Sequence, residues 1–232
     1  MKIGGLERFS LIDYPGQVAA IIFTQGCTFR CGFCYNPELV NPSLFTPTIP
    51  EEEVLTFLKE REGKLGALVI TGGEPTMQED LPEFIARVRA LGMLVKLDTN
   101  GSNPEMLEQL LKDKLVQYVA MDIKAPLDKY ADATCVAIEP ERIKRSIGLI
   151  MKSGVDYEFR TTVVRSQLGS EDFKKIGELI KGAKLYALQK FVIPPIYKIN
   201  NVSFLKEKTY TTEEFEEIRK QMEPHVQSCI LR

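Results

Sequence analysis

The chain has 232 residues, a formal net charge of −2 and a hydrophobic content of 44%. This length and composition suit one large α/β domain, and the balanced charge excludes the basic stripe of a nucleic-acid or anionic-membrane binder. The N-terminal residues do not resemble a signal peptide, and no apolar run is long enough to span a bilayer. Three of the five cysteines are crowded into one short stretch, which is typical of metal binding in a reducing cytoplasm.

Short β-branched runs alternate with amphipathic segments along the whole chain. The predicted strands cover residues 18–24, 67–71, 94–98, 118–122, 157–164 and 186–192. The predicted helices cover residues 51–61, 81–91, 104–112, 139–153, 170–181 and 212–222, with Ser170 as an expected N-cap. Such alternation implies parallel strands with right-handed crossovers in a single α/β domain over residues 1–232. Spacing alone leaves open a doubly wound sheet and a six-unit (β/α)6 partial barrel of the TIM type.

Unusual residues follow the C-terminal ends of four consecutive predicted strands. The first strand leads into GCTFRCGFCYN (26–36) and the second into TGGEP (71–75). The third ends in DTNG (98–101) and the fourth in MDIK (121–124). Loops after the strands of such a barrel share one mouth, so these four segments are expected to form one site.

Cys27, Cys31 and Cys34 follow the pattern C-x3-C-x2-C. This spacing lets three thiolates from one loop converge on one face of a cubane iron–sulfur cluster. Such a cluster ordinarily takes four cysteines, so three leave one iron free for a substrate or cofactor. The same principle keeps one position open in catalytic zinc sites.

The alternative is a zinc site completed by a residue far along the chain: Cys135, Cys229 or His225. None of these has a metal-ligand partner at short spacing, so the iron–sulfur interpretation is favoured. The two distant cysteines are expected to be structural or incidental. The histidine is expected on the surface of the final helix.

The cysteine loop resembles the signature of radical S-adenosylmethionine (SAM) enzymes, C-x3-C-x-aromatic-C, with Phe33 as the aromatic residue. The resemblance implies a [4Fe–4S] cluster whose free iron chelates the amino and carboxylate groups of SAM. One electron then cleaves SAM to methionine and a 5′-deoxyadenosyl radical, which abstracts a hydrogen atom. It also implies the partial barrel rather than the doubly wound sheet.

The resemblance extends to residues that contact SAM. Gly72 and Gly73 allow close backbone approach to a ligand, and with Glu74 they match a segment that contacts the SAM amino group. Taken alone, the glycine pair would be better explained as a simple strand-to-helix turn, and its position directly after the second strand favours the functional interpretation. Asn36 aligns with an asparagine that touches SAM, and Arg160 with a SAM-contacting arginine, although this arginine could instead pair with an acid at the edge of the core.

Two further motifs resemble those of glycyl-radical-enzyme activases. Four residues match a monovalent-cation site, for Na+ or K+, beside the SAM carboxylate: Asp98, Thr99, Met121 and Asp122. Strand alternation points Asp122 and Lys124 the same way, and Lys124 matches a basic residue that holds SAM or the target. The alternative is two acids in turns and a surface lysine.

The opening GGLERFSLIDYPGQVAAIIFTQGC is similar to that of activating proteins of anaerobic ribonucleoside-triphosphate reductase. This implies a glycyl radical enzyme as partner, with a flavodoxin- or ferredoxin-type electron donor. Tyr35 departs from the histidine common in that family, and loses a titratable imidazole beside the cluster. The long connections 125–137 and 193–210 are expected to form a partner surface or a lid.

Two other functions stay open from the sequence. One is a radical SAM enzyme that acts on a small molecule of the pterin or purine type, with the same cluster and cofactor. The other is an iron–sulfur electron carrier or zinc-stabilised binding module without catalysis. The latter gives no purpose to the glycine pair or to the acids that end the third and fourth strands.

Overall fold

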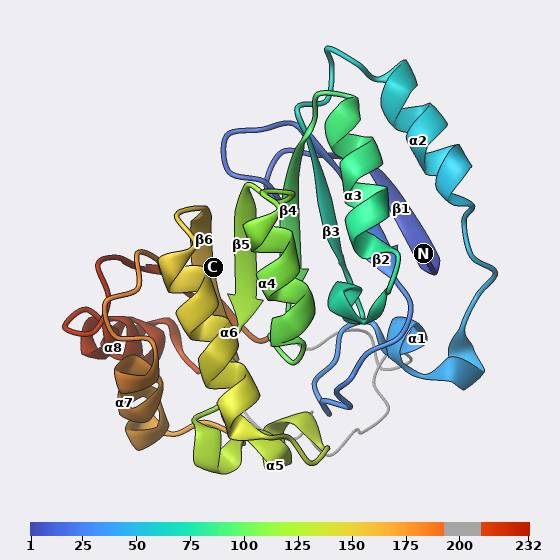
Figure 1. Ribbon diagram of the computed structural model, residues 1–232. Helices are drawn as coiled ribbons and strands as arrows, with labels where there is room; N and C mark the ends of the chain where they lie inside the picture. The colour runs from blue at the N-terminus through green and yellow to red at the C-terminus, as the bar shows by residue number, and fades with distance from the viewer. Residues whose placement is uncertain (193–209) are drawn as a thin grey trace.

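The computed structural model describes residues 1–192 and 210–232, which form an eight-stranded sheet in the order β1 to β8 (Figure 1). The strands are β1 (Ile3–Ser10), β2 (Ala19–Thr24), β3 (Ala67–Gly72), β4 (Leu94–Thr99), β5 (Tyr118–Asp122), β6 (Asp156–Val163), β7 (Tyr186–Lys190) and β8 (Cys229–Leu231). Strand β1 pairs antiparallel with β2, and every later neighbour pairs in parallel.

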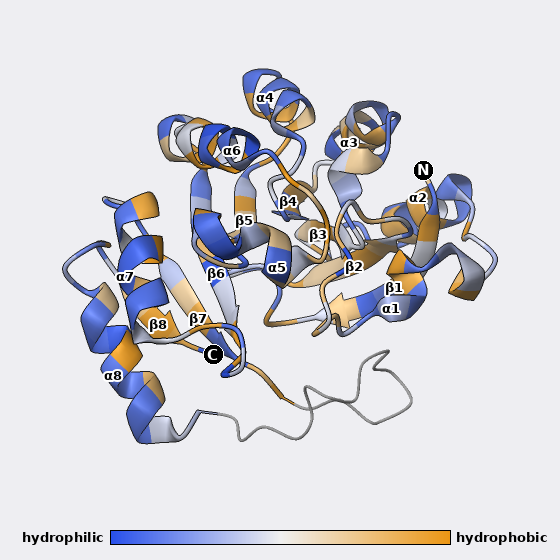
Figure 2. Cartoon of the chain, turned by 90° about the horizontal axis from the view of Figure 1, so that it is seen from below, coloured by the Kyte–Doolittle hydropathy of each residue, from blue (hydrophilic) through white to orange (hydrophobic). Residues whose placement is uncertain are grey.

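The long helices lie on the outer face of this curved sheet, and two short ones lie at the carboxyl ends of the strands (Figure 1, Figure 2). They are α1 (Pro37–Val40), α2 (Glu51–Glu60), α3 (Leu81–Ala90), α4 (Pro104–Lys112), α5 (Tyr130–Thr134), α6 (Pro140–Lys152), α7 (Ser170–Leu179) and α8 (Thr212–Met222), with short 3-10 turns at Pro42–Leu44, Pro75–Met77 and Leu127–Lys129. Figure 2 looks along the strands and shows α3, α4 and α6 as an arc outside them. None of the helices in the two described ranges is long and apolar enough to cross a membrane.

The strand order decides between the two arrangements left open by the sequence. A doubly wound sheet reverses its order at a switch point and carries helices on both faces. Here the strands follow the chain order without reversal, so each crossover winds the same way and the sheet curls into a partial barrel. The predicted fold is therefore confirmed.

The six predicted strands are β2 to β7, and their ends differ from the prediction by at most two residues. Strands β1 and β8 were not predicted. The sequence of β1, IGGLERFS, contains two glycines and two charged residues because an edge strand is only half covered. Strand β8 has only three residues, which is too short for a periodic signal.

Smaller corrections concern the ends of elements. Gly169, not Ser170, is the N-cap of α7. The connection 125–137 contains the 3-10 turn Leu127–Lys129 and helix α5. Of the connection 193–210, residues 193–209 lie outside the described residues, so the prediction of a partner surface or lid is not addressed there. His225 lies after α8, which ends at Met222.

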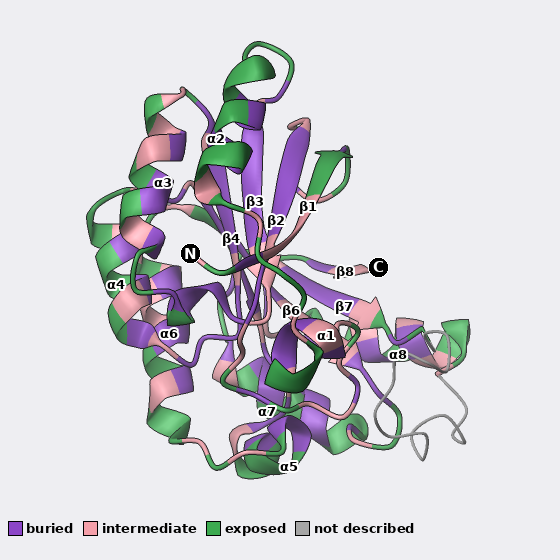
Figure 3. Ribbon diagram, turned by 90° about the vertical axis from the view of Figure 1, so that its right-hand side faces the viewer, coloured by how far each residue is buried: buried purple, intermediate pink, exposed green. Residues whose placement is uncertain are grey.

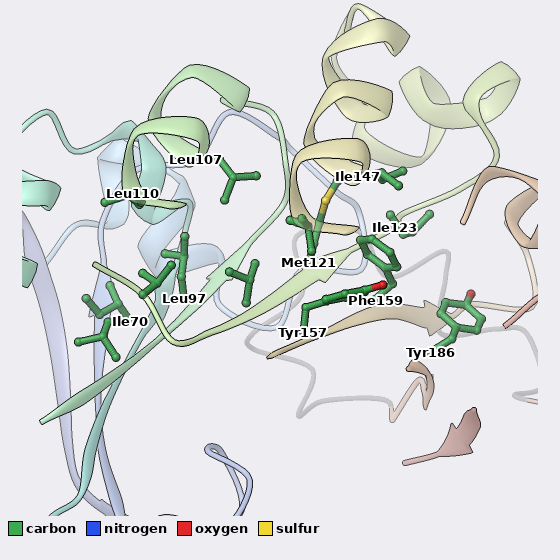
Figure 4. Close-up of a cluster of buried hydrophobic side chains, with 14 of the residues drawn as sticks. Ile70, Leu97, Leu107, Leu110, Met121, Ile123, Ile147, Tyr157, Phe159 and Tyr186 are labelled. Atoms are coloured by element: carbon green, nitrogen blue, oxygen red, sulfur yellow. The ribbon is translucent and has the colours of Figure 1, made fainter. Parts of the chain in front are cut away.

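The main core lies between the sheet and the helices. Figure 4 shows Leu97 and Phe159 from the strands and Leu107 and Ile147 from the helices in one cluster, and Figure 3 shows the strands buried beneath helices with exposed outer faces. Leu97, Leu107 and Phe159 are fully buried. Burying a side chain of this size stabilises the fold by about 1.5–3 kcal/mol, so this layer fixes the barrel.

The opposite, concave face of the sheet carries a smaller core at the N-terminal ends of the strands. Ala19, Ala67 and Ala120 leave room there for two tyrosine rings. Tyr14, from the loop before β2, packs against Tyr118 with ring centroids 5.9 Å apart. These rings fill the barrel at one end, so the open space lies at the C-terminal ends of the strands.

Candidate active site

A cavity of about 380 Å³ opens at the C-terminal ends of the strands. Thirteen of the fourteen predicted site residues line it: Cys27, Cys31, Phe33, Cys34, Asn36, Gly72, Gly73, Glu74, Asp98, Thr99, Asp122, Lys124 and Arg160. The four strand-end segments therefore meet as predicted. Their individual roles toward a cofactor stay predictions.

The exception is Met121. Its side chain is fully buried and packs toward the helices, where a Cβ on Gly101 would come within 2.0 Å of its Cε atom. Strand alternation explains this, because Met121 precedes Asp122 and so points to the opposite face of β5. The thioether thus belongs to the core.

The residues weighed for a zinc site lie apart from one another. Cys229 is buried in β8, and His225 packs on Gly177 with its Nδ1 atom 3.2 Å from Glu178. The predicted surface position of His225 is therefore only partly right, because its side chain is 17% exposed. Cys135 is exposed and lines a separate cavity that also touches Cys31.

The cysteine loop is held from both sides. The main-chain N–H of Arg30 donates to the carbonyl of Thr134 in α5 at 2.8 Å, and that of Gly26 donates to the carbonyl of Leu39 in α1 at 2.7 Å. The loop therefore presents its sulfurs from a fixed backbone. Burial raises the pKa of Cys27 to about 12 and that of Cys31 to about 11.

Three sheltered thiols on one loop fit an iron–sulfur cluster. Buried thiols stay neutral unless a metal stabilises the thiolate. A cluster bound here would supply that positive charge, and Cys27, Cys31 and Cys34 would hold it. The donor set leaves one iron without a protein ligand from this loop, facing the same cavity as the strand ends.

Gly72 and Gly73 are required by close backbone contacts. Gly72 has φ +118°, and a Cβ there would lie 2.3 Å from the main-chain nitrogen of Thr24. A Cβ on Gly73 would lie 2.0 Å from the carbonyl oxygen of Gly26. The pair therefore lets the end of β3 pack against the start of the cysteine loop, while it also lines the cavity. The simple-turn interpretation does not account for these contacts.

The carboxylate of Glu74 is fully buried and saturated by hydrogen bonds. Its Oε1 atom accepts from the main-chain N–H and hydroxyl of Thr76, at 3.0 and 2.6 Å, and from the Thr99 hydroxyl at 2.8 Å. Its Oε2 atom accepts from the main-chain N–H of Asn100 at 2.6 Å. Burial raises the pKa of Glu74, although the hydrogen bonds from these donors act to lower it. Glu74 thus joins the loop after β3 to the loop after β4.

A continuous row of charged side chains crosses the cavity wall from β4 to β6. Arg160 lies between the two aspartates, with Nη1 3.0 Å from Asp98 Oδ2 and Nε 2.8 Å from Asp122 Oδ1. Lys96 Nζ is 2.9 Å from Asp98 Oδ1, and Lys124 Nζ is 2.9 Å from Asp122 Oδ2. Strand register produces the row, because Asp122 and Arg160 are direct neighbours across β5 and β6.

The row carries three positive and two negative charges. Burial opposes ionisation of both aspartates. Even so, Arg160 and Lys96 hold the pKa of Asp98 below its usual value, and Arg160 and Lys124 do the same for the pKa of Asp122. The carboxylates in turn raise the pKa of Lys124 despite its burial. Both carboxylates are therefore ionised at neutral pH, and Lys124 and Arg160 stay protonated. One positive charge is left uncompensated, which suits an anionic ligand group.

The same row bears on the predicted monovalent cation. Three of the four aspartate oxygens accept hydrogen bonds from Arg160 or Lys124. The fourth, Asp98 Oδ1, is buried beside Lys96, at an ion-pair distance but outside hydrogen-bonding angles. A cation between the aspartates would face three cationic side chains. This arrangement does not fit Na+ or K+, so we assign no step to either ion.

Comparison with known proteins places these features in a family. The model of the radical SAM superfamily matches residues 21–180. The chain belongs to the radical SAM superfamily. It is therefore a radical SAM enzyme, a class that uses a [4Fe–4S] cluster and SAM.

Three relatives narrow the comparison. The chain is 34% identical to a candidate glycyl-radical enzyme activating enzyme of Methanocaldococcus jannaschii, over 99% of this chain and 95% of the relative. It is 30% identical to the pyruvate formate-lyase-activating enzyme of Listeria monocytogenes, over 53% of each chain. It is 33% identical to the 7-carboxy-7-deazaguanine synthase of Methanopyrus kandleri, over 49% of this chain and 52% of the relative. The chain thus matches about half the length of the latter two.

A solved structure supports the fold. The crystal structure of Streptococcus suis SuiB bound to S-adenosylmethionine superposes with a TM-score of 0.67. The superposition covers 91% of this chain and 49% of SuiB, at 15% sequence identity. This likeness concerns the fold alone.

Several residues of the site were not singled out from the sequence. Lys96 lies within an apolar strand and is 3% exposed; a lysine there was itself a signal, because a buried ammonium needs a partner. Asn100 contacts Cys27, which no spacing rule reveals. Tyr35, noted only as a departure, packs against Phe191 with ring centroids 5.6 Å apart and an interplanar angle of 41°, and its hydroxyl accepts from the main-chain N–H of Val192 at 2.9 Å.

Proposed function

We propose that this enzyme is a glycyl-radical-enzyme activase. The similarity to the M. jannaschii relative carries the proposal, because it extends over 99% of this chain rather than over the cluster region alone. When bound, the cluster and SAM would supply a 5′-deoxyadenosyl radical. That radical would take one hydrogen atom from the Cα of a partner glycine, which yields 5′-deoxyadenosine and a glycyl radical.

The cavity supports this use of SAM. The charged row has one more positive than negative charge, and its members Arg160 and Lys124 line the cavity, which suits the α-carboxylate of SAM; the backbone of Gly72 and Gly73 suits its amino group. Asn36 lies at the rim, where its main-chain N–H bonds Cys34. Phe33 packs with Val164 and Phe191 against the cluster loop, and its ring lies 5.8 Å from Lys124 Nζ. These contacts exclude water from the cluster side.

The partner in this proposal is anaerobic ribonucleotide reductase, with a flavodoxin- or ferredoxin-type donor that delivers the electron. The opening of the chain, GGLERFSLIDYPGQVAAIIFTQGC, supports this choice. Residues 11–18 of that opening bring Tyr14 across the concave face of the barrel, so it also has a structural role. The enzyme would bind Na+ or K+ beside SAM only if SAM first broke one ion pair of the charged row and so freed an aspartate oxygen.

The test is made anaerobically on reconstituted protein. Wild type reduced with dithionite should cleave SAM to 5′-deoxyadenosine, and with the reductase present it should give the glycyl-radical signal in electron paramagnetic resonance (EPR). Cys31→Ala should lose the cluster and both products. Cys135→Ala is the matched control, because that cysteine lies beside the loop but is exposed, and it should retain all three. SAM cleavage without a glycyl radical on the reductase would reject this partner.

A second function is favoured by one observation, the 33% identity to a 7-carboxy-7-deazaguanine synthase over about half of each chain. In this alternative the same cavity takes a pterin- or purine-type metabolite instead of a peptide glycine. The two functions differ in where hydrogen comes from. With deuterium at the glycine of the reductase, an activase would place deuterium in 5′-deoxyadenosine, whereas a small-molecule enzyme would not.

A further inference from the structure

The side chain of Asn100 reaches from the loop after β4 to the first cluster cysteine. Its Nδ2 atom lies 3.7 Å from Cys27 Sγ and 3.0 Å from the Thr28 hydroxyl. Asn100 is 5% exposed, so its amide makes these contacts away from bulk water. The main-chain N–H of Phe29 is a second donor to the same sulfur, at 3.4 Å.

The direction of the amide is fixed by its other bonds. The carbonyl Oδ1 of Asn100 accepts from the main-chain N–H of Ser102 at 2.9 Å. A main-chain N–H can only donate, so the oxygen must face Ser102 and the NH₂ group must face the sulfur. The flipped amide would place two donors against each other. The Asn100 side chain is therefore a donor toward Cys27.

The backbone of Asn100 is held equally firmly. Its main-chain N–H donates to Oε2 of Glu74 at 2.6 Å, and Glu74 is anchored by Thr76 and Thr99. On the other side, the Thr28 hydroxyl is 2.8 Å from the Ser102 hydroxyl. The donor is thus placed by both neighbouring loops and cannot move away without breaking this network.

A donor held this firmly suits a charged acceptor better than a neutral thiol. A thiol sulfur is a weak acceptor, whereas a thiolate bound to iron carries negative charge and accepts strongly. Hydrogen bonds to cluster sulfurs, and the residues that orient metal ligands, set reduction potentials. One-electron reduction adds negative charge to the cluster and its sulfurs, so a donor stabilises the reduced form more than the oxidised form.

We propose that Asn100 is a positioning residue that hydrogen-bonds the cluster-bound sulfur of Cys27 and makes one-electron reduction of the cluster by a low-potential donor more favourable. This rests on the cluster of the proposed function. Cys27 differs from Cys31 and Cys34 in receiving this side-chain donor within the described residues. Asn100 therefore links reduction of the cluster to the loop that follows β4.

The experiment is a redox titration of the reconstituted holoenzyme, followed by EPR of the reduced cluster, with iron content measured on the same samples. Asn100→Ala removes the donor, and the equilibrium constant for reduction should fall about tenfold, which is about 59 mV for one electron. Asn100→Asp keeps the shape and the acceptor to Ser102 but places negative charge near the sulfur. Its potential should fall further than that of Asn100→Ala.

Ser102→Ala is an intermediate variant. It removes the hydroxyl contact to Thr28 but keeps the main-chain N–H that orients Asn100, so the potential should fall less than in Asn100→Ala. If Asn100→Ala takes up too little iron for the titration, the reduction potential of the isosteric Asn100→Asp variant is the deciding measurement. An unchanged potential in Asn100 variants that hold full iron would overturn the proposal and leave the activase function intact. A wild-type protein that takes up no cluster would overturn both.

Discussion

Removing the Lys96 ammonium tests whether the row of charges is buried and cooperative. In Lys96→Met the variant side chain keeps a similar length and loses its charge, which leaves Asp98 Oδ1 without its partner at 2.9 Å. Lys96 and Asp98 are only 4% and 13% exposed, so water compensates poorly. Breaking a buried pair costs about 3–5 kcal/mol, and because Arg160 still holds the other oxygen of Asp98, we expect about 3 kcal/mol.

The assay is urea unfolding of the apoprotein at pH 7, followed by circular dichroism. Lys181→Met is the control, because the Lys181–Glu178 pair is 3.4 Å long with side chains 65% and 61% exposed. A solvated pair of that kind contributes at most about 0.5 kcal/mol. Equal losses of unfolding free energy in the two variants would refute the reasoning, since they would show that the row is solvated.

The pH dependence gives an independent check. In the wild type the pKa of Asp98 in the folded protein is held below the ordinary value of 3.8. Its ion pairs therefore stabilise the fold fully above pH 3.8, and this stabilisation is lost as the pH falls through the pKa of the folded state. In Lys96→Met the folded pKa of Asp98 rises, so its buried charge is neutralised at a higher pH. The difference in unfolding free energy should therefore narrow as pH is lowered from 7 toward 4. A gap that widens would contradict this.

Two other substitutions test the loops around the cluster. In Gly73→Ala the new methyl group would meet the carbonyl of Gly26 at 2.0 Å, so we expect the unfolding free energy to fall by about 1–3 kcal/mol and the iron content to be lower. The control Gly148→Ala places its methyl group in open space on helix α6 and should instead raise the unfolding free energy by about 0.8 kcal/mol. Equal iron content in the two variants would speak against the close contact. Tyr35→Phe removes the acceptor for the main-chain N–H of Val192 and keeps the ring. Both partners of this hydrogen bond are exposed, so calorimetry should show that the unfolding free energy falls by less than about 1 kcal/mol. A larger loss would mean that this contact closes the cavity.

The sequence by itself determined the barrel's six central units and the location of its chemistry. Period-two runs and amphipathic segments are local patterns, so β2 to β7 and the six long helices were readable within two residues. Three cysteines in one loop and a glycine pair after β3 are also local. Because parallel strands end at the same edge of the sheet, their convergence in one cavity followed from topology alone.

Only the tertiary structure decided which partners these residues have. Asp98 and Asp122 were predicted to flank a cation, yet the register of β4, β5 and β6 places Arg160 between them and Lys96 behind. Glu74 was predicted to face SAM, yet its carboxylate accepts hydrogen bonds from Thr76 in its own loop and from Thr99 and Asn100 at the end of β4.

The contact of Asn100 with Cys27 joins residues 73 positions apart. It depends on how closely two neighbouring strand ends pack, and no pattern along the chain encodes that distance. Spacing fixes which residues reach the mouth of the barrel. Ion pairing and hydrogen bonding across strands then fix which charges are left for a ligand, because a buried charge takes its nearest partner wherever that partner lies in the sequence.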